Sequence, residues 1–491
     1  FGFDIINYFL ATPEARFNGK LYGDILLSQL LSRPKFAAAV NVDSMKMNET
    51  LLGDLKVHSD WSVEDDTISI AAAMTLGELK TMELKGFYQP DSTGAIKFDL
   101  NFNRFRLAAF NPFVSSIAEN LRGYVNGNVK VRGSTGTPEL SGELELPKLA
   151  FTVSFLQTDY SLTDVPKLNL SANKISFPSL NLKDTKYGTS GVLSGEIRHD
   201  NFSDIELDIK VDAENLLVLN TPGTSEDYYY GTAFATGTIS LTGPTDDITV
   251  SADVTTDKIK SGDDEVRTSF NIPLDNATQV KKSDFITFID PTKPDSLKED
   301  PIQRLNLDNA ITIDFDMNVD TDADVAIILS ERTGNRMDAT GNGNIRLKID
   351  PFSEMELFGT YTVQEGEYRF NLQGLFNKKF QILRGGTVSW NGSPYEARLN
   401  IQALYTTKAD PSVLVSGYSG GRTTVEIYMT LSGPLTNPEI TFDIQLPRTS
   451  GAVQTVLKNR INTTEQKNQQ VFSLLALNTF SQESAIFQSG G

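Results

Sequence analysis

Acidic residues between positions 320 and 331 have the spacing of a calcium-binding loop. Aspartates occupy the first, third and fifth places of the loop and a glutamate the twelfth, where an EF-hand places its carboxylates: Asp320, Asp322, Asp324 and Glu331. Such a loop also needs glycine at the sixth place, which here is Val325, and helices on both sides. The apolar residues that follow are typical of a strand. We therefore expect a solvated strand and turn here, without a metal.

Histidine occurs only at His58 and His199, so a zinc site or a serine–histidine relay has to use these two. Neither lies in a metal-binding or nucleophile motif. Ser171 and Lys174 match the short SxxK pattern of penicillin-binding enzymes, but the companion motifs SDN and KTG are absent. A glycosidase with paired carboxylates stays an alternative, because the chain has 63 acidic residues and no spacing singles out a pair. We expect a non-enzymatic protein that needs no cofactor.

The elements that would position such residues are strands, and three with strictly alternating polarity are predicted at 96–103, 205–212 and 311–318. In each, an apolar residue stands at every second position and a charged, amide or hydroxyl residue stands between. A period of two is typical of a strand with one apolar and one polar face. A slip of one residue would exchange the faces, so the register is well specified.

The stretch from Gly359 to Tyr405 contains four more alternating runs. They end in Glu-Gly, Gln-Gly, Gly-Gly and Asn-Gly, which are dipeptides typical of turns. This pattern predicts a β-meander with one apolar face.

A glycine, a strand and then a proline recur along the chain. In the copies that begin at Gly23 and Gly127, a proline follows eleven residues later. Further copies keep the spacing with a substitution at one position: they pair Gly237 with Ile248, Gly343 with Glu354 and Ile427 with Pro438. Repeats that cannot bury a face alone predict a stacked array. Hairpins of any β-protein share these features, which is the alternative interpretation.

Helices are predicted at three places. The first covers 111–123, between an Asn-Pro start and a closing glycine. The other two lie near the C-terminus, at 451–460 and at 465–478, the latter capped by Thr464. The segment 290–304 is rich in proline and charge and is predicted to be an exposed loop.

Length and charge bound the class of protein. A chain of 491 residues can hold about three domains or one long repeat array. The net charge of −19 argues against nucleic-acid binding and against docking on anionic lipid headgroups by charge alone. Cysteine is absent, and no apolar run reaches roughly eighteen residues, so neither disulfides nor a transmembrane helix is predicted. The start at Phe1, without Met or a signal-like segment, favours a piece of a longer chain.

Three segments of the C-terminal half carry a specific pattern: FNKKFQILRGGTVSWNGSPYEARLNIQALY (376–405), LSGPLTNPEITFDIQLP (431–447) and NQQVFSLLALNTF (468–480). In this order they resemble the C-terminal domain of the TamB family, the translocation-and-assembly-module proteins of diderm bacteria. The resemblance covers about residues 230–487. The part upstream is similar in its looser β-repeat pattern to AsmA-like proteins, which belong with TamB to the bridge-like lipid transfer superfamily.

The resemblance implies a periplasmic protein that bridges the inner and outer membranes. It implies a β-sheet curled round a hydrophobic groove and a role in moving phospholipid to the outer membrane and in outer-membrane protein assembly. It also implies an outer-membrane barrel of the BamA/TamA family as partner, and an inner-membrane anchor in a part of the protein that precedes this sequence.

These observations together predict an all-β, elongated and curled repeat sheet with short helices near the C-terminus. We expect a β-repeat segment over 1–229, a TamB-like β-domain over 230–447 and a helical segment over 448–491.

The apolar strand faces can form the dry core of a sandwich or line an open groove, where each buried methylene contributes about 0.8 kcal/mol to lipid binding. The resemblance favours the groove and a phospholipid bridge; the alternative is a scaffold that assists assembly of outer-membrane proteins through edge strands. Groove candidates are Ile96, Phe98, Leu100, Phe102, Ile205, Leu207, Ile209, Val211, Ile313, Phe315, Met317, Phe370, Leu372, Ile427, Met429, Phe442 and Ile444. Partner-contact candidates are Val471, Phe472, Leu475 and Phe480.

Overall fold

Strands make up most of the molecule. The computed structural model describes residues 16–28, 35–62, 66–90, 94–115, 117–154, 156–200, 203–223, 230–273, 310–330, 333–350, 355–372 and 376–482. It is 70% strand and 10% helical, and the strands of the described part belong to one large mixed sheet of 27 strands. Two helices, α4 (Gly451–Arg460) and α5 (Thr464–Leu477), lie near the C-terminus. The all-β class and the C-terminal helices predicted from the sequence are thus confirmed.

The chain divides into two compact units. Unit 1 comprises the described residues within Phe1–Leu219, Thr236–Ala252 and Leu305–Thr312. Unit 2 comprises those within Asn220–Ala235, Asp253–Arg304 and Ile313–Gly491. The domain boundaries expected after residues 229 and 447 stay a prediction.

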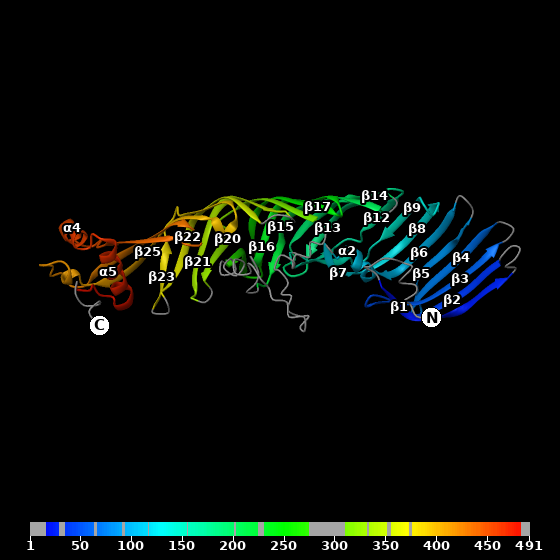
Figure 1. Ribbon diagram of the computed structural model, residues 1–491, viewed down its shortest axis with the longest axis horizontal. Coiled ribbons are helices and arrows are strands. Elements are labelled where there is room, and N and C mark those ends of the chain that lie inside the picture. The colour runs from blue at the N-terminus through cyan, green and yellow to red at the C-terminus, as the bar shows by residue number, and fades with distance from the viewer. Residues whose placement is uncertain are drawn as a thin grey trace, which may run out of the picture. The chain divides into compact units, whose positions relative to one another are not determined.

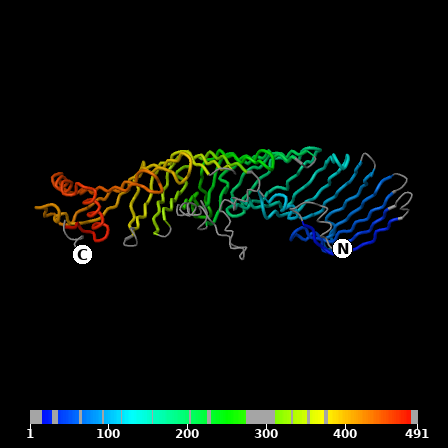
Figure 2. The backbone as a smooth tube through the Cα atoms, in the orientation of Figure 1, coloured from blue at the N-terminus to red at the C-terminus, as the bar shows by residue number. Residues whose placement is uncertain are grey.

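In unit 1 each strand from β2 to β5 pairs antiparallel with the strands before and after it, and β6 pairs with β5 and β8 (Figure 1). Figure 2 shows their backbones passing back and forth as neighbours. The strands of this unit are β1 (Phe17–Ser28), β2 (Lys35–Met47), β3 (Thr50–Ser62), β4 (Thr67–Leu76), β5 (Leu79–Tyr88), β6 (Ile96–Arg106), β7 (Ala118–Arg122), β8 (Tyr124–Gly133), β9 (Pro138–Glu145), β10 (Ala150–Val153), β11 (Thr158–Leu162), β12 (Lys167–Ser171), β13 (Lys174–Asp184), β14 (Ser190–Asp200) and most of β15 (Ser203–Thr221).

Register shifts in neighbouring strands of unit 1 bend the sheet along one line. They fall within β2, β4 and β6, for example between Met74 and Thr75. In β3 the same line passes through Gly53, whose φ is +126° and where a Cβ would lie 2.1 Å from the carbonyl oxygen of Thr75. Only glycine fits such a position, and bulges bend the strand that carries them. A core packs at the bend, formed by Met47, Leu52, Met74, Phe105, Leu107, Ala109, Val125 and Leu146.

The helix predicted over 111–123 is wrong beyond its first turn. A 3-10 turn, η1 (Leu107–Phe110), leads into the single helical turn α2 (Asn111–Val114), and β7 follows. β7 pairs with β10, and the Leu121 N–H donates to Asn111 Oδ1 at 2.7 Å. Pairing with a neighbouring strand outweighs the weak helical pattern of this segment.

Among the pairings described in unit 2, one is parallel: Thr268–Pro273 of β18 lies alongside Ala323–Ile328 of β20. The others described are antiparallel. Strands β15, β16, β17 and β19 contribute residues to both units. The remaining strands are β16 (Tyr230–Pro244), β17 (Asp247–Ser261), β18 (Asp264–Pro273), β19 (Ala310–Val319), β20 (Ala323–Ser330), β21 (Asn335–Ile349), β22 (Glu356–Leu372), β23 (Phe376–Ile382), β24 (Thr387–Gly392), β25 (Arg398–Ala409), β26 (Thr423–Pro434) and β27 (Glu439–Gln445).

The sheet of unit 2 curls so that its apolar face closes on itself. The ring centroids of Phe370 in β22 and Phe442 in β27 are 6.4 Å apart. In the order of pairing, however, β23, β25 and β26 stand between these two strands. A flat sheet would hold strands four places apart at about 19 Å, so the contact requires curvature.

The C-terminal helices lie on this closed face. Leu457 of α4 and Val471, Leu474 and Leu475 of α5 belong to the core cluster that the strands of the meander also form. A capping box starts α5: Thr463 Oγ1 accepts the Gln466 N–H at 3.2 Å, and Gln466 Oε1 accepts the Thr463 N–H at 3.3 Å. The N-cap is therefore Thr463, one residue before the predicted Thr464.

The recurrent glycine–proline spacing marks antiparallel hairpins. The copies that begin at Gly23, Gly127, Gly343 and Ile427 lie in the hairpins β1–β2, β8–β9, β21–β22 and β26–β27. Two of the positions that end a copy, Pro34 and Glu354, lie outside the described residues, as does the loop predicted at 290–304.

Candidate functional site

One face of unit 1 carries a continuous row of apolar residues across twelve strands. Residues paired across adjacent antiparallel strands share a face, and the pairings connect each member of this row to the next. No member is polar or charged. The apolar row is Gly23, Val40, Val57, Ala72, Leu84, Leu100, Val129, Gly142, Leu170, Ile175, Ile197 and Leu207.

The structure brings two of the predicted groove strands onto this face. Leu100 and Leu207 belong to the apolar row, and the remaining candidates of β6 and β15 stand two or four residues from them on the same face: Ile96, Phe98, Phe102, Ile205, Ile209 and Val211. Leu207 is buried, and the other seven are half-buried. On the same face of β1, Ile25 is 64% and Leu27 55% exposed. Solvent therefore reaches much of this face.

The opposite face of these strands is ionic. Arg132 lies 2.6 Å from Asp99, and Lys174 and Arg198 both lie 2.8 Å from Glu196. A hydrogen bond from Arg132 lowers the pKa of Asp99, and one from Lys174 lowers the pKa of Glu196. Charges on this face therefore have oppositely charged partners within the sheet. The apolar row contains no group that could pair with a charge.

Unit 2 places its groove candidates at different depths. Ile313, Ile427, Met429 and Ile444 are buried. Phe315, Met317, Phe370 and Phe442 are half-buried. Leu372 ends β22, and its side chain lies outside the described part. Burial here follows from the curl of the sheet and from the helices on it.

The predicted partner-contact residues mostly belong to the core of unit 2. Val471, Leu475 and Phe480 are buried, and Phe472 is half-buried. The tail that carries Phe480 is held by Gln470, whose side chain accepts the Ser481 N–H at 2.9 Å and donates to the Ser481 carbonyl at 3.0 Å. A partner reaches the buried side chains only if this segment moves, so their role in partner binding stays a prediction.

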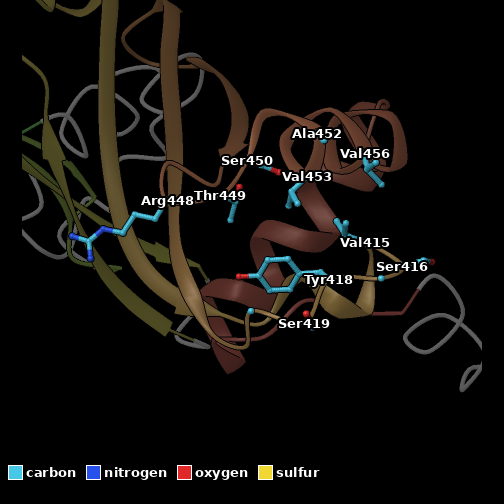
Figure 3. A pocket seen from close by; sticks show the side chains of 12 residues that line it. Val415, Ser416, Tyr418, Ser419, Arg448, Thr449, Ser450, Ala452, Val453 and Val456 are labelled. Carbon is cyan, nitrogen blue, oxygen red and sulfur yellow. The ribbon is translucent and has the colours of Figure 1, made fainter.

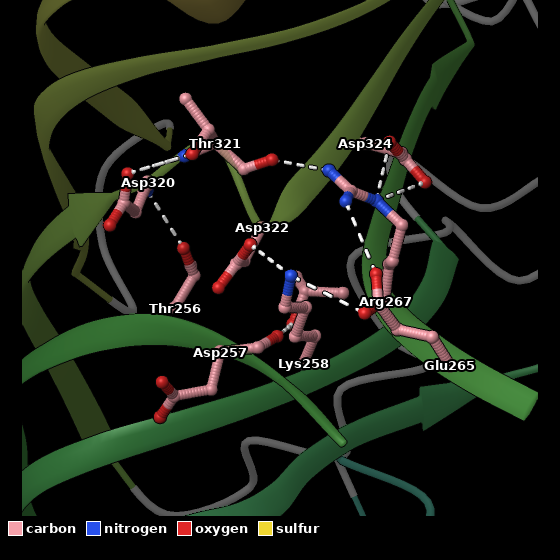
Figure 4. A network of polar contacts seen from close by, with 10 residues as sticks. Thr256, Asp257, Lys258, Glu265, Arg267, Asp320, Thr321, Asp322 and Asp324 are labelled. Carbon is pink, nitrogen blue, oxygen red and sulfur yellow. Dashed lines mark hydrogen bonds and ion pairs between the residues drawn. The ribbon is translucent and has the colours of Figure 1, made fainter. Parts of the chain in front are cut away.

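The calcium-like spacing forms ion pairs in the structure (Figure 4). Asp322 lies 3.1 Å from Lys258 Nζ, and Asp324 lies 3.1 Å from Arg267 Nε. The sixth place of the motif lies in β20, and the twelfth lies outside the described residues. Within the described ranges, no group of three or more His, Asp or Glu residues is arranged to hold a metal. The network ties the turn between β19 and β20 to β17 and β18.

The histidines and the SxxK match have structural partners. His58 Nε2 lies 2.7 Å from Asp60 on an exposed surface, while His199 is buried in β14. The Ser171 hydroxyl donates to the Lys174 carbonyl at 3.0 Å across the turn between β12 and β13, and the Lys174 ammonium binds a carboxylate of β14. Hydroxyl and amine therefore serve the turn and the sheet, and they do not contact each other as nucleophile and base.

A cavity of about 520 Å³ lies between the loop 415–420 and the start of α4 (Figure 3). Tyr418 and Val415 border it on one side, and Thr449 and Val453 on the other, while the side chain of Arg448 points away. Its lining mixes hydroxyls with small apolar groups, without a converging charge.

Sequence reasoning missed one cation on the apolar face of unit 2, Lys378 in β23. The signal was present in the sequence, because Lys378 stands at the same every-second position as Phe376, Phe380 and Ile382. Its neighbour Lys379 faces the other way and lies 3.0 Å from Glu367.

In a comparison with known families, a model described as the TamB C-terminal domain matches residues 180–491. No curated protein and no solved structure matches the chain.

Among the described residues, no helix has both the length and the apolar character that crossing a bilayer requires.

Proposed function

This chain belongs to the TamB family, and from that premise we propose that it shields phospholipid acyl chains between the inner and outer membranes. TamB-family proteins span the periplasm of diderm bacteria and take part in outer-membrane assembly and lipid transport. The observation that carries the proposal for this chain is the apolar row of unit 1.

Acyl chains are held by apolar area rather than by a polar site. Each methylene that leaves water contributes about 0.8 kcal/mol, so a continuous apolar row binds a chain without any single decisive residue. Only Val129 and Leu207 of the row are buried, which leaves the others to contact a ligand. In this proposal the protein is not an enzyme: no bond is made or broken, and Ile, Leu, Val and Phe act together.

The test is a charge placed in the middle of the row. Leu100→Arg should leave unit 1 folded, because a half-buried guanidinium still reaches water, but should remove phospholipid from organic extracts of the purified protein measured by mass spectrometry. Asn101→Arg is the matched control, since Asn101 is exposed on the opposite face of the same strand. A full lipid load in folded Leu100→Arg, or no lipid in the unmodified protein, would refute the proposal.

A second candidate function is a scaffold for outer-membrane protein assembly, supported by the edge of β27. The family generally works with an outer-membrane TamA partner. In the described part of the chain β27 pairs only with β26, and its outer edge is covered at one end by Gln454, which accepts the Leu446 N–H at 2.7 Å and donates to the Ile444 carbonyl at 3.4 Å. Backbone groups alternate between edges, so Ile440 and Phe442 direct theirs outward, where a partner strand can pair.

Proline substitutions test this edge. Ile440→Pro removes an outward N–H and should abolish co-purification of a TamA-type barrel while preserving the β26–β27 ladder. Thr441→Pro removes an N–H that faces β26 and should instead destabilise the ladder. Retention of the barrel by a folded Ile440→Pro variant would exclude this edge as the contact.

A further inference from the structure

Lys378 lies where the strand pattern calls for an apolar side chain. In β23 Phe380 and Ile382 face the core and are 0% and 2% exposed, and Lys378 stands two residues before Phe380 on the same face. Its partner in β22 is Phe370, which is also on that face. The next residue, Lys379, points to the opposite face.

The ammonium lies over one aromatic ring, which belongs to a chain of ring contacts. Lys378 Nζ lies 5.7 Å from the centroid of the Tyr405 ring, and Tyr405 is 5.4 Å from the ring of Phe380. Phe370 is in turn in ring contact with Phe442 of β27. We call Phe370, Lys378, Tyr405 and Phe442 the Lys378 patch; all four residues are half-buried, so each is partly exposed to solvent at this part of the face.

The charge of Lys378 has no counterpart in the described part of the chain, where no carboxylate lies within ion-pair distance of its ammonium. Three cations of the same unit do have one: Lys379 and Arg369 both lie within 3.3 Å of Glu367, and Lys467 lies 3.4 Å from Asp443. The cation–π contact with Tyr405 offsets only part of the hydration that a half-buried ammonium gives up. An anion from outside the described chain would complete the site.

We propose that the Lys378 patch binds the phosphate of an anionic phospholipid, with the adjoining acyl chain against Phe370 and Phe442. An ammonium forms a strong charge-assisted hydrogen bond to a phosphate oxygen, and the aromatic rings supply the apolar area that the acyl chain needs. The patch rests on the proposed function, in which phospholipid is the cargo, and it adds a headgroup contact that the apolar row of unit 1 does not contain.

Two neighbouring lysines on opposite faces make the test. The purified chain is titrated calorimetrically with dihexanoylphosphatidylglycerol, with the uncharged dihexanoylglycerol and with inorganic phosphate. Lys378→Met should weaken binding of the phosphatidylglycerol about tenfold, the size of one lost charged hydrogen bond, and should leave binding of the uncharged lipid unchanged. Lys379→Met should change neither. Methionine suits an apolar sheet face, so Lys378→Met is expected to fold.

Three results overturn the proposal. They are an unchanged phosphatidylglycerol affinity in Lys378→Met, an equal loss in Lys379→Met, and inorganic phosphate that binds as tightly as the lipid, which would make this a site for free phosphate. Lys378→Gln repeats the test with a polar side chain if the methionine variant melts early. The two proposals can fail separately. The conduit proposal fails if folded Leu100→Arg keeps its long-chain lipid in extracts, whereas the patch proposal fails if Lys378→Met keeps its affinity for the short-chain phosphatidylglycerol.

Discussion

Leu100 in unit 1 and Met429 in unit 2 stand in the same kind of alternating strand, yet Leu100 is half-buried and Met429 is 0% exposed. Both strands have neighbours on either side, so pairing does not explain the difference. In unit 2 the sheet curls until Phe370 meets Phe442, and α4 and α5 cover its face. In unit 1 the row continues across twelve strands, and only Val129 and Leu207 of its members are buried. Closure therefore comes from the curl of the sheet and from the helices on its face, and not from the alternating pattern of a single strand.

The comparison has a direct readout, because the chain has two tryptophans, Trp61 in unit 1 and Trp390 in unit 2. Single-tryptophan variants follow the unfolding of each unit separately.

A charge placed on the apolar face should give the largest difference in lost stability between the two units. Met429→Arg places an unpaired guanidinium in a dry core and should cost more than about 4 kcal/mol in the free energy of unfolding. Leu100→Arg should cost less than about 1.5 kcal/mol, because its charge reaches water. Urea unfolding followed at Trp390 and at Trp61 measures both. Similar losses at the two sites would mean that the face of unit 1 is also closed in solution.

Replacing an aromatic side chain by alanine should also destabilise unit 2 more than unit 1, with a smaller difference between them. Phe380→Ala removes a fully buried side chain and should cost about 3 to 5 kcal/mol through lost burial and a cavity. Phe98→Ala should cost about 1 to 2 kcal/mol, because a half-buried ring loses less contact. Denaturant midpoints of the two variants are the measurement. A Phe98 cost as large as that of Phe380 would contradict an open face.

Alkaline pH should weaken the closed face through Tyr368. Burial raises the pKa of Tyr368 to about 12, against about 10 in the unfolded chain. The contribution of Tyr368 to the free energy of unfolding is fully present below pH 10 and is lost as the pH rises toward 12, because only the unfolded tyrosine ionises readily in that interval. The loss is roughly 2 to 3 kcal/mol. Tyr368→Phe should delay the alkaline transition at Trp390. Tyr160→Phe is the control in unit 1, since burial also raises the pKa of Tyr160, and it should act at Trp61 only.

The two covering helices should respond differently to loss of the N-cap. Thr463→Ala removes the capping box of α5 and should cost about 1 kcal/mol. Ser450→Ala should cost a few tenths of a kcal/mol at most, because the Ser450 side chain makes no cap hydrogen bond to α4. Thermal melts followed at Trp390 compare them. Equal shifts would show that propensity rather than the cap decides the stability of α5.

The strands could be predicted from the sequence because a period of two depends only on neighbouring residues. Thus 205–212 lies in β15, and the predicted 451–460 helix is α4. Depth could not be predicted in this way. Ile209 and Ile427 occupy similar alternations, and their different burial arises from contacts with strands and helices distant in sequence. The predicted helix over 111–123 failed for the same reason, since its second half pairs with β10.

In the candidate site, too, the face on which a residue lies could be predicted from the sequence, whereas its burial could not. Sequence parity placed Ile96, Phe98, Leu100 and Phe102 together on one face. The same parity places Lys378 on the apolar face, although its charge does not mark it as a member of an apolar pattern. The burial of Val471 and Leu475 could not be read from α5 alone, because an amphipathic helix looks alike whether it covers its own sheet or a partner.

The parallel pair of β18 and β20 has a consequence for the order of folding. Hairpins such as β26–β27 join residues close in sequence and can form early, whereas the β18–β20 pair must first bring together strands separated by residues 274–322. Closing a long connection costs conformational entropy before any stabilising contact forms, so non-local pairings slow folding. We therefore expect the C-terminal meander to acquire protection from amide exchange first and β18 to join it last. Shortening the connection should speed that final phase while leaving the meander unchanged.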